Sequence, residues 1–465
     1  MSSTDTPGGY REQSARTIRE EPNVRDSVLF GTDLANGHRN HAYSEIDSDR
    51  WRDWGRDVKT HTLAHLDRYL EEAERNLEAN GVRVHWAEKA DDALTILRGI
   101  VREHDVKSVV KAKSMLSEEL GVNEHLEKLA VHVRETDLGE YIVQVLGQPP
   151  SHIVGPAMHL SLDDCRRLFH KRFGTPLDGE PEMLVAAARV ALREEFLAAD
   201  LGISGGNFLV AETGTVALIE NEGNIRLSTS LPRVHVAFVG IEKLIPRFED
   251  LAGFIQLTAR AATGQPIGNY VSFIQGPRKS DEVDGPEEVH VVLVDNGRTN
   301  LLADDAAWEA LRCVRCGACL NICPVYRQTG GHAYGFTYSG PIGAIIAPGL
   351  LGLEEAMPLP YASSLCGACA DVCPVRIPIP ELLVHWRERA VEEGLTSPTE
   401  RLGLKAFTAA AAHPLLYQTG AALMRATPWE AGGRALPILS GWMQERDAPK
   451  PSPKSFQAMW KDGIE

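Results

Sequence analysis

The sequence predicts an α/β domain, then a cysteine-rich and mainly helical domain, and finally a helical C-terminal extension. Three observations carry this prediction. Apolar strand-type stretches alternate with helix-type stretches between about residues 56 and 300, which is typical of crossover units in a mainly parallel sheet. Seven of the eight cysteines stand between residues 313 and 373. Residues 396–465 are rich in Ala, Leu, Pro and Trp, a composition that suits helices with a poorly ordered tail.

The composition of the chain narrows the classes of function. A chain of 465 residues is too long for one compact core, so we expect roughly two to four domains. The net charge of −16 argues against a nucleic-acid partner, because nucleic acids attract basic surfaces. The chain has neither a signal-peptide pattern nor an apolar run of about 18 residues, so we expect a cytoplasmic protein without a transmembrane segment. Peripheral contact with a membrane stays open.

Four regions follow from the changes in composition along the chain. The polar residues 1–55 are predicted to form a loosely packed N-terminal arm. Residues 56–300 form the α/β domain, residues 301–395 the cysteine-rich domain, and residues 396–465 the helical extension.

Helices and strands alternate in the first half of the α/β domain. Apolar residues recur with helical spacing over 58–79, and Gly81 ends this helix. Alternating apolar and polar residues predict the next strand, 82–86. Further helices are expected at 90–101, 117–130 and 140–146, and further strands at 108–113, 131–135 and 152–154.

The second half of this domain adds an antiparallel element. A strong helix at 182–199 precedes a strand-like run, 207–219, which closes on the hairpin signal Asn221–Asn224. A helix is expected at 243–263, and strands at 234–239, 270–274 and 289–294. We therefore predict an open, mixed sheet. In the cysteine-rich domain, helical runs are expected to end at Arg312 and to cover 381–393.

The cysteines form two related motifs. The first reads Cys313-x-x-Cys316-x-x-Cys319-x-x-x-Cys323-Pro324, and the second reads Cys366-x-x-Cys369-x-x-x-Cys373-Pro374. Two-cluster bacterial ferredoxins hold iron–sulfur cubanes with this spacing, and the fourth cysteine of each motif ligates the other cluster. The first predicted cluster is therefore held by Cys313, Cys316, Cys319 and Cys373. The second is held by Cys323, Cys366 and Cys369.

The second predicted cluster lacks one cysteine ligand. A complete motif would carry a cysteine three positions before Cys366, where Ser363 stands. The fourth iron is held by the Ser363 hydroxyl, by another side chain or by water, or it is absent and leaves a [3Fe–4S] cluster. Structural zinc also uses Cys-x-x-Cys pairs, but it needs only four ligands per ion. It therefore does not explain a longer run of cysteines that ends in Cys-Pro and occurs in two copies. Cys165 stands alone and is expected to be a packing residue.

A small-ligand site is a separate hypothesis for the α/β domain. Strand ends followed by small hydroxyl residues often form anion sites in open α/β sheets. The candidate residues are Lys111, Lys113, Glu135, Glu212, Thr213 and Thr215. Backbone N–H groups of Gly202–Asn207 are a further candidate for a carboxylate or phosphate. The alternative is that these residues serve turns and structural ion pairs only.

Several of these segments resemble one known family. They are Cys313–Tyr326, Gly340–Ala344 and Ser363–Val375, together with Lys111–Met115, Glu135–Glu140 and Ala211–Val216. They resemble the iron–sulfur protein of bacterial L-lactate utilisation, the LutB type. The resemblance implies two [4Fe–4S] clusters on the seven motif cysteines in a ferredoxin-like domain. It also implies an α/β fold similar to formyltetrahydrofolate cyclo-ligase and CoA-transferase-like proteins.

The same resemblance implies a function and partners. Members act with a second iron–sulfur protein and a lactate-utilisation-domain protein to oxidise L-lactate to pyruvate. The expected role is that of an electron-transfer component of an L-lactate dehydrogenase complex. One alternative is that the α/β domain itself binds substrate and catalyses, with the clusters as an electron sink. A second is a non-redox interaction or sensing module. Cluster potentials, the terminal acceptor, the lactate-binding subunit and the oligomeric state are beyond the sequence.

Overall fold

The computed structural model describes residues 6–426 and 452–463, which belong to two compact units, 1–390 and 391–465. The core of the first unit is a six-stranded sheet in the order β1-β10-β7-β4-β2-β3, and every neighbouring pair in it is parallel. Its strands are β1 (Arg83–Ala87), β2 (Ser108–Lys111), β3 (His132–Glu135), β4 (Leu201–Ser204), β7 (Val234–Gly240) and β10 (Glu288–Val294). The predicted α/β domain with a mainly parallel sheet is confirmed.

The single open, mixed sheet that the sequence predicted is wrong in this respect, because the antiparallel element forms a second sheet of its own. Its four strands run in the order β8-β5-β6-β9, with β6 antiparallel to both of its neighbours. They are β5 (Phe208–Val210), β6 (Thr215–Glu220), β8 (Leu244–Ile245) and β9 (Tyr270–Ile274).

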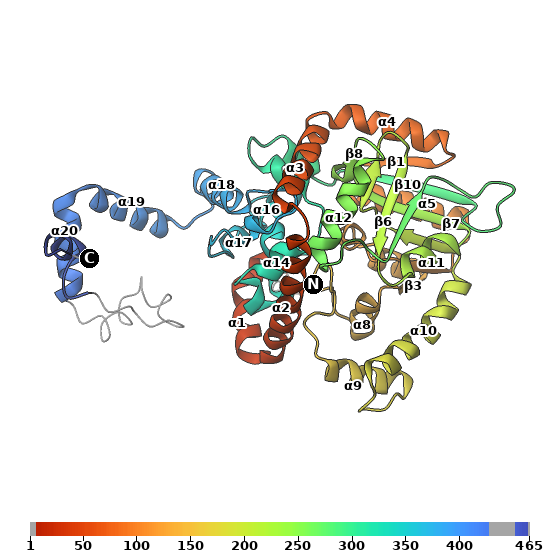
Figure 1. Ribbon diagram of the computed structural model, residues 1–465, viewed down its shortest axis with the longest axis horizontal. Coiled ribbons are helices and arrows are strands. Elements are labelled where there is room, and N and C mark those ends of the chain that lie inside the picture. Colours follow the sequence, from red (N-terminus) through yellow and green to blue (C-terminus); the bar gives the residue numbers. More distant parts are fainter. Residues whose placement is uncertain (1–5, 427–451, 464–465) are drawn as a thin grey trace. The chain divides into compact units, whose positions relative to one another are not determined.

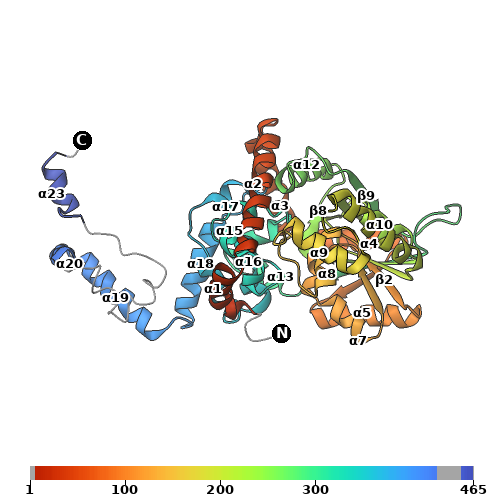
Figure 2. The ribbon, with the colours of Figure 1, turned by 90° about the horizontal axis from the view of Figure 1, so that it is seen from below.

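Helices cover both faces of the parallel sheet (Figures 1 and 2). On one face, Leu97 of α5 and Leu126 of α7 pack against Val236 and Val292. On the other face, Leu70 and Leu77 of α4 pack against the strands of both sheets. The helices of this domain are α4 (Leu66–Ala79), α5 (Ala90–Glu103), α6 (Met115–Glu119), α7 (Val122–Lys128), α8 (Leu138–Leu146), α9 (Leu162–Phe173), α10 (Pro181–Ala198), α11 (Asn224–Ser230) and α12 (Asp250–Ala262).

Three predicted elements are wrong. The expected strand 152–154 is a loop, in which the N–H groups of Val154 and Gly155 donate to His152 Nδ1. The expected helix 243–263 is divided into the short strand β8 and α12, since Pro246 between them has no N–H to donate. The chain reverses at residues 211–214 rather than at Asn221–Asn224, which leads into α11 instead.

Two expected helices are each broken by a local turn. The run 58–79 is divided at His65 between α3 and α4. The run 117–130 is divided between α6 and α7, because Gly121 adopts a left-handed φ of 69°.

The N-terminal residues fold as three helices, α1 (Tyr10–Glu20), α2 (Pro22–Ser44) and α3 (Ser48–Ala64). Figures 1 and 2 show α1 and α2 beside the cysteine-rich helices. Asn36 Nδ2 donates to the Asn321 carbonyl at 2.9 Å, and Arg52 Nε donates to the Cys373 carbonyl at 2.9 Å. The region predicted to be an arm therefore packs against both cysteine motifs.

The cysteine-rich region consists of short helical segments. They are α13 (Arg298–Leu302), η3 (Ala307–Arg312), α14 (Ala318–Ile322), α15 (Tyr326–Thr329), η4 (His332–Tyr334), α16 (Gly340–Leu351), η5 (Leu359–Tyr361), α17 (Ala368–Asp371) and α18 (Ile379–Glu392).

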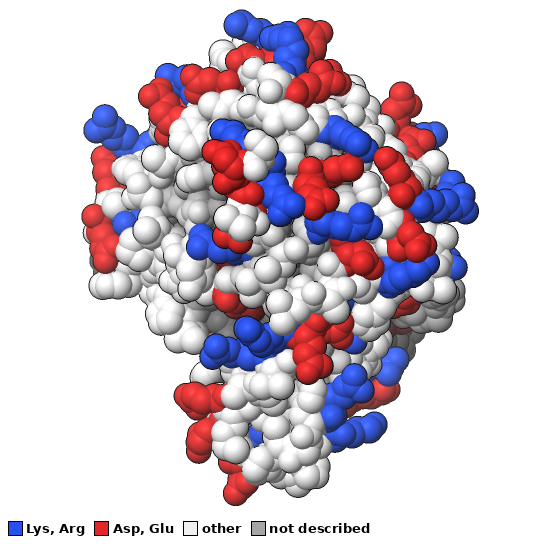
Figure 3. Space-filling view, turned by 90° about the vertical axis from the view of Figure 1, so that its right-hand side faces the viewer, with Lys and Arg blue, Asp and Glu red and all other residues white. Residues whose placement is uncertain are grey.

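The second unit is helical in its described part, as predicted. It contains α19 (Pro398–Ala412), α20 (Pro414–Ala426) and α23 (Phe456–Lys461), and most of the predicted disordered tail lies outside the described residues. None of the described helices combines the length and the apolar character needed to span a bilayer. On the face shown in Figure 3, basic and acidic side chains are interspersed, so this face has no continuous basic surface for nucleic acid.

Candidate iron–sulfur centre

The two cysteine motifs share one backbone conformation. Gly317 directly follows Cys316, and Gly367 directly follows Cys366. Their φ angles are 76° and 86°. The residues two positions earlier, Arg315 and Leu365, are also left-handed, with φ angles of 60° and 55°. Left-handed φ is uncommon for residues other than glycine. The same strained turn therefore precedes α14 and α17 and fixes the backbone of the cysteines on both sides of it.

Four of the cysteines line one small cavity. They are Cys313, Cys316, Cys319 and Cys373, the set predicted for the first cluster. Every pair among these four thiols interacts electrostatically. The structure thus brings a cysteine of the second motif to three cysteines of the first.

The remaining three motif cysteines gather in the same way. Cys323, Cys366 and Cys369 interact pairwise, so a cysteine of the first motif has joined two of the second. The two groups approach each other at Cys319 and Cys369, in the first turns of the neighbouring helices α14 and α17. Cys165 stands apart in α9, against the apolar cluster of Phe169 and Leu184, which agrees with a packing role.

The chemistry of these thiols fits a cationic cluster. Burial, followed by the proximity of other thiols, raises the pKa of Cys319 and raises the pKa of Cys369 to about 12. Burial also raises the pKa of Cys316, Cys323 and Cys373. Buried thiols that face one another become thiolates only when a cation compensates their charge. Iron within a cubane supplies that charge, so the residues present fit the group.

Backbone amides support the sulfur atoms. The Arg315 N–H donates to Cys313 Sγ and the Ile377 N–H donates to Cys373 Sγ, each at 3.3 Å. Hydrogen bonds to cluster sulfurs stabilise the more negative, reduced form of a cluster and so raise its potential.

The two groups of cysteines differ in their exposure. In the first group Cys316, Cys319 and Cys373 are buried, whereas Cys366 of the second group is exposed. Ser363 is half-buried, and its Oγ accepts the Leu365 N–H at 3.1 Å. Cys323 and Cys369 are also buried, so Cys366 alone gives the second group its accessible end.

A buried ion network connects the α/β domain to the first motif. Arg298 Nε is 2.6 Å from Glu242 Oε2, and Arg298 Nη2 is 2.8 Å from Glu119 Oε2. Arg315 contacts Glu242 Oε1 at 3.4 Å and lies over the Tyr338 ring at 4.5 Å. The position of Arg315, between Cys313 and Cys316, thus depends on carboxylates of the α/β domain.

A cavity of about 320 Å³ lies between the α/β domain and the first motif. Three neighbouring strands, β2, β4 and β7, end at this cavity. Its lining includes Lys113, Gly205, Gly206, Asn207, Lys243, Arg315 and Cys316. Carboxyl ends of parallel strands are the usual ligand position in such sheets. Cationic side chains, glycine backbone and one cysteine of the first group therefore line the same cavity.

The six residues predicted for a small-ligand site lie in separate places. Only Lys113 lines this cavity, and its Nζ donates to the Val154 carbonyl at 2.6 Å. Lys111 Nζ is fully buried, 2.7 Å from both Glu118 Oε1 and Glu135 Oε1, so its ammonium is paired with carboxylates inside the domain and does not face the cavity.

The other three predicted residues belong to the turn between β5 and β6. Glu212 accepts the Phe248 N–H at 2.8 Å, and the Thr213 and Thr215 hydroxyls bond each other at 2.7 Å. Asn76 of α4 holds this turn by donating to the Ala211 and Glu212 carbonyls. Sequence reasoning missed Lys243, Arg315 and Glu242 at the cavity, because only the fold brings them there.

Fold and site together define an iron–sulfur protein in which an α/β domain precedes a two-cluster domain. The chain matches the LUD domain over residues 70–294, the 4Fe-4S dicluster domain over 309–377 and the lactate utilisation protein B C-terminal domain over 388–463.

Similar proteins match over nearly their whole length. Lactate utilization protein B of Macrococcus caseolyticus is 42% identical, over 96% of this chain and 95% of the relative. Lactate utilization protein B of Shouchella clausii is 44% identical, over 94% of each chain. The uncharacterized electron transport protein YkgF of Escherichia coli is 41% identical, over 99% of this chain and 97% of the relative. The chain therefore belongs to the lactate utilization protein B family, and the resemblance seen in the sequence is confirmed.

Proposed function

We propose that this protein is the iron–sulfur electron-transfer subunit of a multiprotein system that oxidises L-lactate to pyruvate. The observation that carries the proposal is the regrouping of the motif cysteines into two adjoining sets, one beside the internal cavity and one with the exposed Cys366. Oxidation of one lactate to pyruvate releases two electrons and two protons. A pair of iron–sulfur clusters supplies two one-electron couples when bound. The family membership supports lactate as the source of the electrons.

We assign the ligands as the sequence predicted them. Cys313, Cys316, Cys319 and Cys373 hold the first cluster. Cys323, Cys366 and Cys369 hold the second, with Ser363 as the candidate for the fourth ligand. The order from the cavity through Cys316, Cys319 and Cys369 to the exposed Cys366 gives electrons a route from the cavity to the surface.

Partner proteins are part of this proposal. The proposed partners are a second iron–sulfur protein and a lactate-utilisation-domain protein. Cys366 and Ser363, at the accessible end of the second group, mark the surface at which a partner exchanges electrons. Free, closely spaced cysteines suit a reducing compartment, so we propose that the complex works in the cytoplasm.

One experiment separates the relay from its alternatives. The anaerobically purified protein is mixed with L-lactate, with and without the two partners, and its visible absorption and electron paramagnetic resonance spectra are recorded. A relay is reduced by lactate only when the partners are present. Reduction by lactate alone would make this chain the catalyst, and clusters that never change oxidation state would leave a structural or sensing role.

The second candidate function is favoured by the cavity itself. Lys243 and Arg315 face a space large enough for a small carboxylic acid, directly beside Cys316. In this case the α/β domain binds the substrate and the clusters accept its electrons. Lys243→Met would then abolish reduction by lactate alone, whereas Lys107→Met, at an exposed lysine of the same domain, would leave it unchanged.

A further inference from the structure

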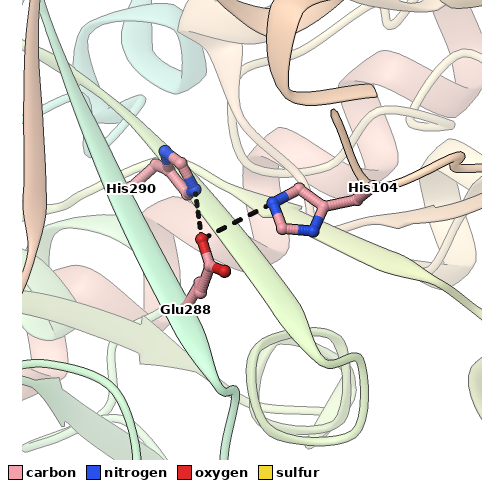
Figure 4. Close-up of side chains that lie close together, drawn as sticks. All are labelled: His104, Glu288 and His290. Carbon is pink, nitrogen blue, oxygen red and sulfur yellow. Dashed lines mark ion pairs between the residues drawn. The ribbon is translucent and has the colours of Figure 1, made fainter. Parts of the chain in front are cut away.

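Three side chains converge at the amino-terminal end of β10, which is the end of the parallel sheet opposite the cavity. Figure 4 shows His104, Glu288 and His290 pointing toward one another. Glu288 and His290 are on the first residues of β10, and His104 directly follows α5. Because α5 packs on the face of β10 that carries His290 and Val292, the end of the helix delivers His104 to the start of the strand.

The facing atoms of these side chains have no hydrogen-bond partner. His104 Nε2, Glu288 Oε2 and His290 Nε2 are all buried and make no hydrogen bond, although Glu288 Oε2 has an ion-pair contact with Arg83. The carboxylate oxygen is 3.5 Å from His104 Nε2 and 3.6 Å from His290 Nε2. These distances exceed the usual range of about 2.7–3.2 Å for an N–H···O bond. Burying the two imidazole nitrogens without a hydrogen-bond partner is unfavourable unless a cation lies between them and the carboxylate.

The spacing suits a metal ion better than a shared proton. Ligand bonds of about 2.0–2.1 Å in a tetrahedral site place neighbouring ligand atoms roughly 3.3–3.4 Å apart. All three atoms lie within 4.8 Å of one another, so one ion can reach all of them. A protonated imidazole would instead draw the carboxylate into hydrogen-bond range of one ring.

The surroundings orient the ligands as metal sites do. His290 Nδ1 is 3.0 Å from His85 Nε2, and the two rings are stacked with an interplanar angle of 9°. With a proton on Nδ1, this contact leaves His290 Nε2 free as a ligand. The second contact of the carboxylate is Arg83 Nη1, which is 2.9 Å from Glu288 Oε2 but also 3.2 Å from Glu103 Oε1. Glu103 offsets the charge of Arg83, whose side chain is half exposed.

We propose that His104, Glu288 and His290 bind a divalent transition-metal ion, separate from the iron–sulfur clusters. Two imidazoles and one carboxylate are a donor set for zinc or for non-haem iron(II), with the remaining position left to water. The ion would link the C-terminal end of α5 to the first residues of β10. The carboxylate group around Lys111 is no rival site, since the buried lysine ammonium already occupies it.

The test uses zinc on the complete protein. The anaerobic holoprotein is freed of loosely bound metal with a chelator, and Zn²⁺ is titrated back while bound zinc, iron and sulfide are counted. We expect one zinc per chain with iron and sulfide unchanged. Zinc K-edge X-ray absorption should show nitrogen and oxygen at about 2.0–2.1 Å, without the sulfur at about 2.3 Å that a cysteine site would give.

Variants assign the zinc to these residues. Glu288→Gln and His290→Gln should each lose at least tenfold in zinc affinity, and His85→Gln should lose about 10- to 100-fold through the orientation of His290. His132→Gln is the matched control, because His132 pairs with Glu195 at an exposed site in the same domain. Zinc should raise the melting temperature of the wild type and of this control but not that of Glu288→Gln.

Three outcomes would overturn the proposal. They are the failure of the wild type to bind zinc in a 1:1 ratio, sulfur in the zinc coordination shell, and undiminished zinc binding by Glu288→Gln and His290→Gln. Circular dichroism of each variant distinguishes a lost ligand from a lost fold.

Discussion

Replacing Arg298 by Met should strongly destabilise the first unit of the chain. The Arg298 side chain is only 1% exposed and contacts Glu119 and Glu242, which are 3% and 1% exposed. Methionine fills much of the same volume but leaves both carboxylates without the guanidinium. Breaking a buried ion pair in this way costs about 3–5 kcal/mol.

The remaining contacts of the two carboxylates favour the lower end of that range. Glu119 still accepts hydrogen bonds from Tyr338 and Asn296, and Glu242 keeps its contact with Arg315. We therefore expect a loss of about 3 kcal/mol at pH 7. The additional change Glu119→Gln removes one uncompensated charge and should recover about half of the loss.

The loss should become smaller on acidification. In the wild type, burial opposes ionisation of Glu242, but Arg298, Lys243 and Arg315 outweigh it and lower the pKa of this carboxyl to about 2. This group therefore stabilises the fold above the unfolded pKa of about 4.5, and that stability is lost as the pH falls toward 2. Without Arg298, the pKa of this carboxyl lies higher than in the wild type, so the variant lacks part of that stability at pH 7 and loses less of it on acidification.

The assay is urea unfolding of anaerobic holoprotein, followed by far-ultraviolet circular dichroism at pH 7 and pH 5. A loss below about 1 kcal/mol at pH 7, or a difference from the wild type that grows at pH 5, would refute the reasoning. Arg167→Met provides the control, since the Arg167 side chain is 63% exposed and its ion pair with Asp164 should contribute little.

Three further predictions follow from single positions. A Cβ atom at Gly331 would lie 1.7 Å from the Ser151 carbonyl oxygen, so Gly331→Ala should lose about 1–3 kcal/mol in urea unfolding, whereas Gly99→Ala, with open space on α5, should be neutral or stabilising. Burial, and after it the nearby His332, lowers the pKa of His159 to about 3, so the fold should lose stability as the pH falls below about 6.5. His159→Gln should therefore lose less stability than the wild type between pH 7 and pH 5.5 in urea unfolding. Equal losses would contradict this. Ser363→Ala should remove about one iron per chain if Ser363 is the fourth ligand, whereas an unchanged iron content would exclude Ser363 from that position.

Strands were predicted correctly where a short run of neighbouring residues carries the strand pattern. The run Val289–Val294 is apolar except for His290, and it became the buried strand β10 between two other strands. The strand expected at 152–154 failed because long-range contacts decide this loop, including His152 Nε2 with the Asn321 side chain. The hairpin turn was misplaced because contacts with Asn76 of α4, far away in the sequence, hold the chain at residues 211–214.

The candidate sites likewise fall into those that sequence spacing reveals and those that only the fold brings together. The spacing of the cysteines and the crossed grouping follow from one short repeat, so sequence reasoning reached both sets. The small-ligand residues were chosen for their chemical type, and a sequence pattern does not tell Lys111, which is buried in an ion cluster, from Lys113, which lines the cavity. His104 and Glu288 are distant in the sequence, and their proximity arises only when α5 packs on β10.

The crossed grouping of the cysteines is tested most directly by counting iron in paired variants. Anaerobic preparations of Cys313→Ser, Cys369→Ser and Cys373→Ser are compared with the double variants, and Cys165→Ser serves as the control that keeps all its iron. If Cys313 and Cys373 serve one cluster, their double variant should lose no more iron than either single variant, at most about four per chain. The Cys369 and Cys373 double variant should lose the iron of both clusters. The reverse result, with additive losses for Cys313 and Cys373 and no added loss for Cys369 and Cys373, would contradict the account.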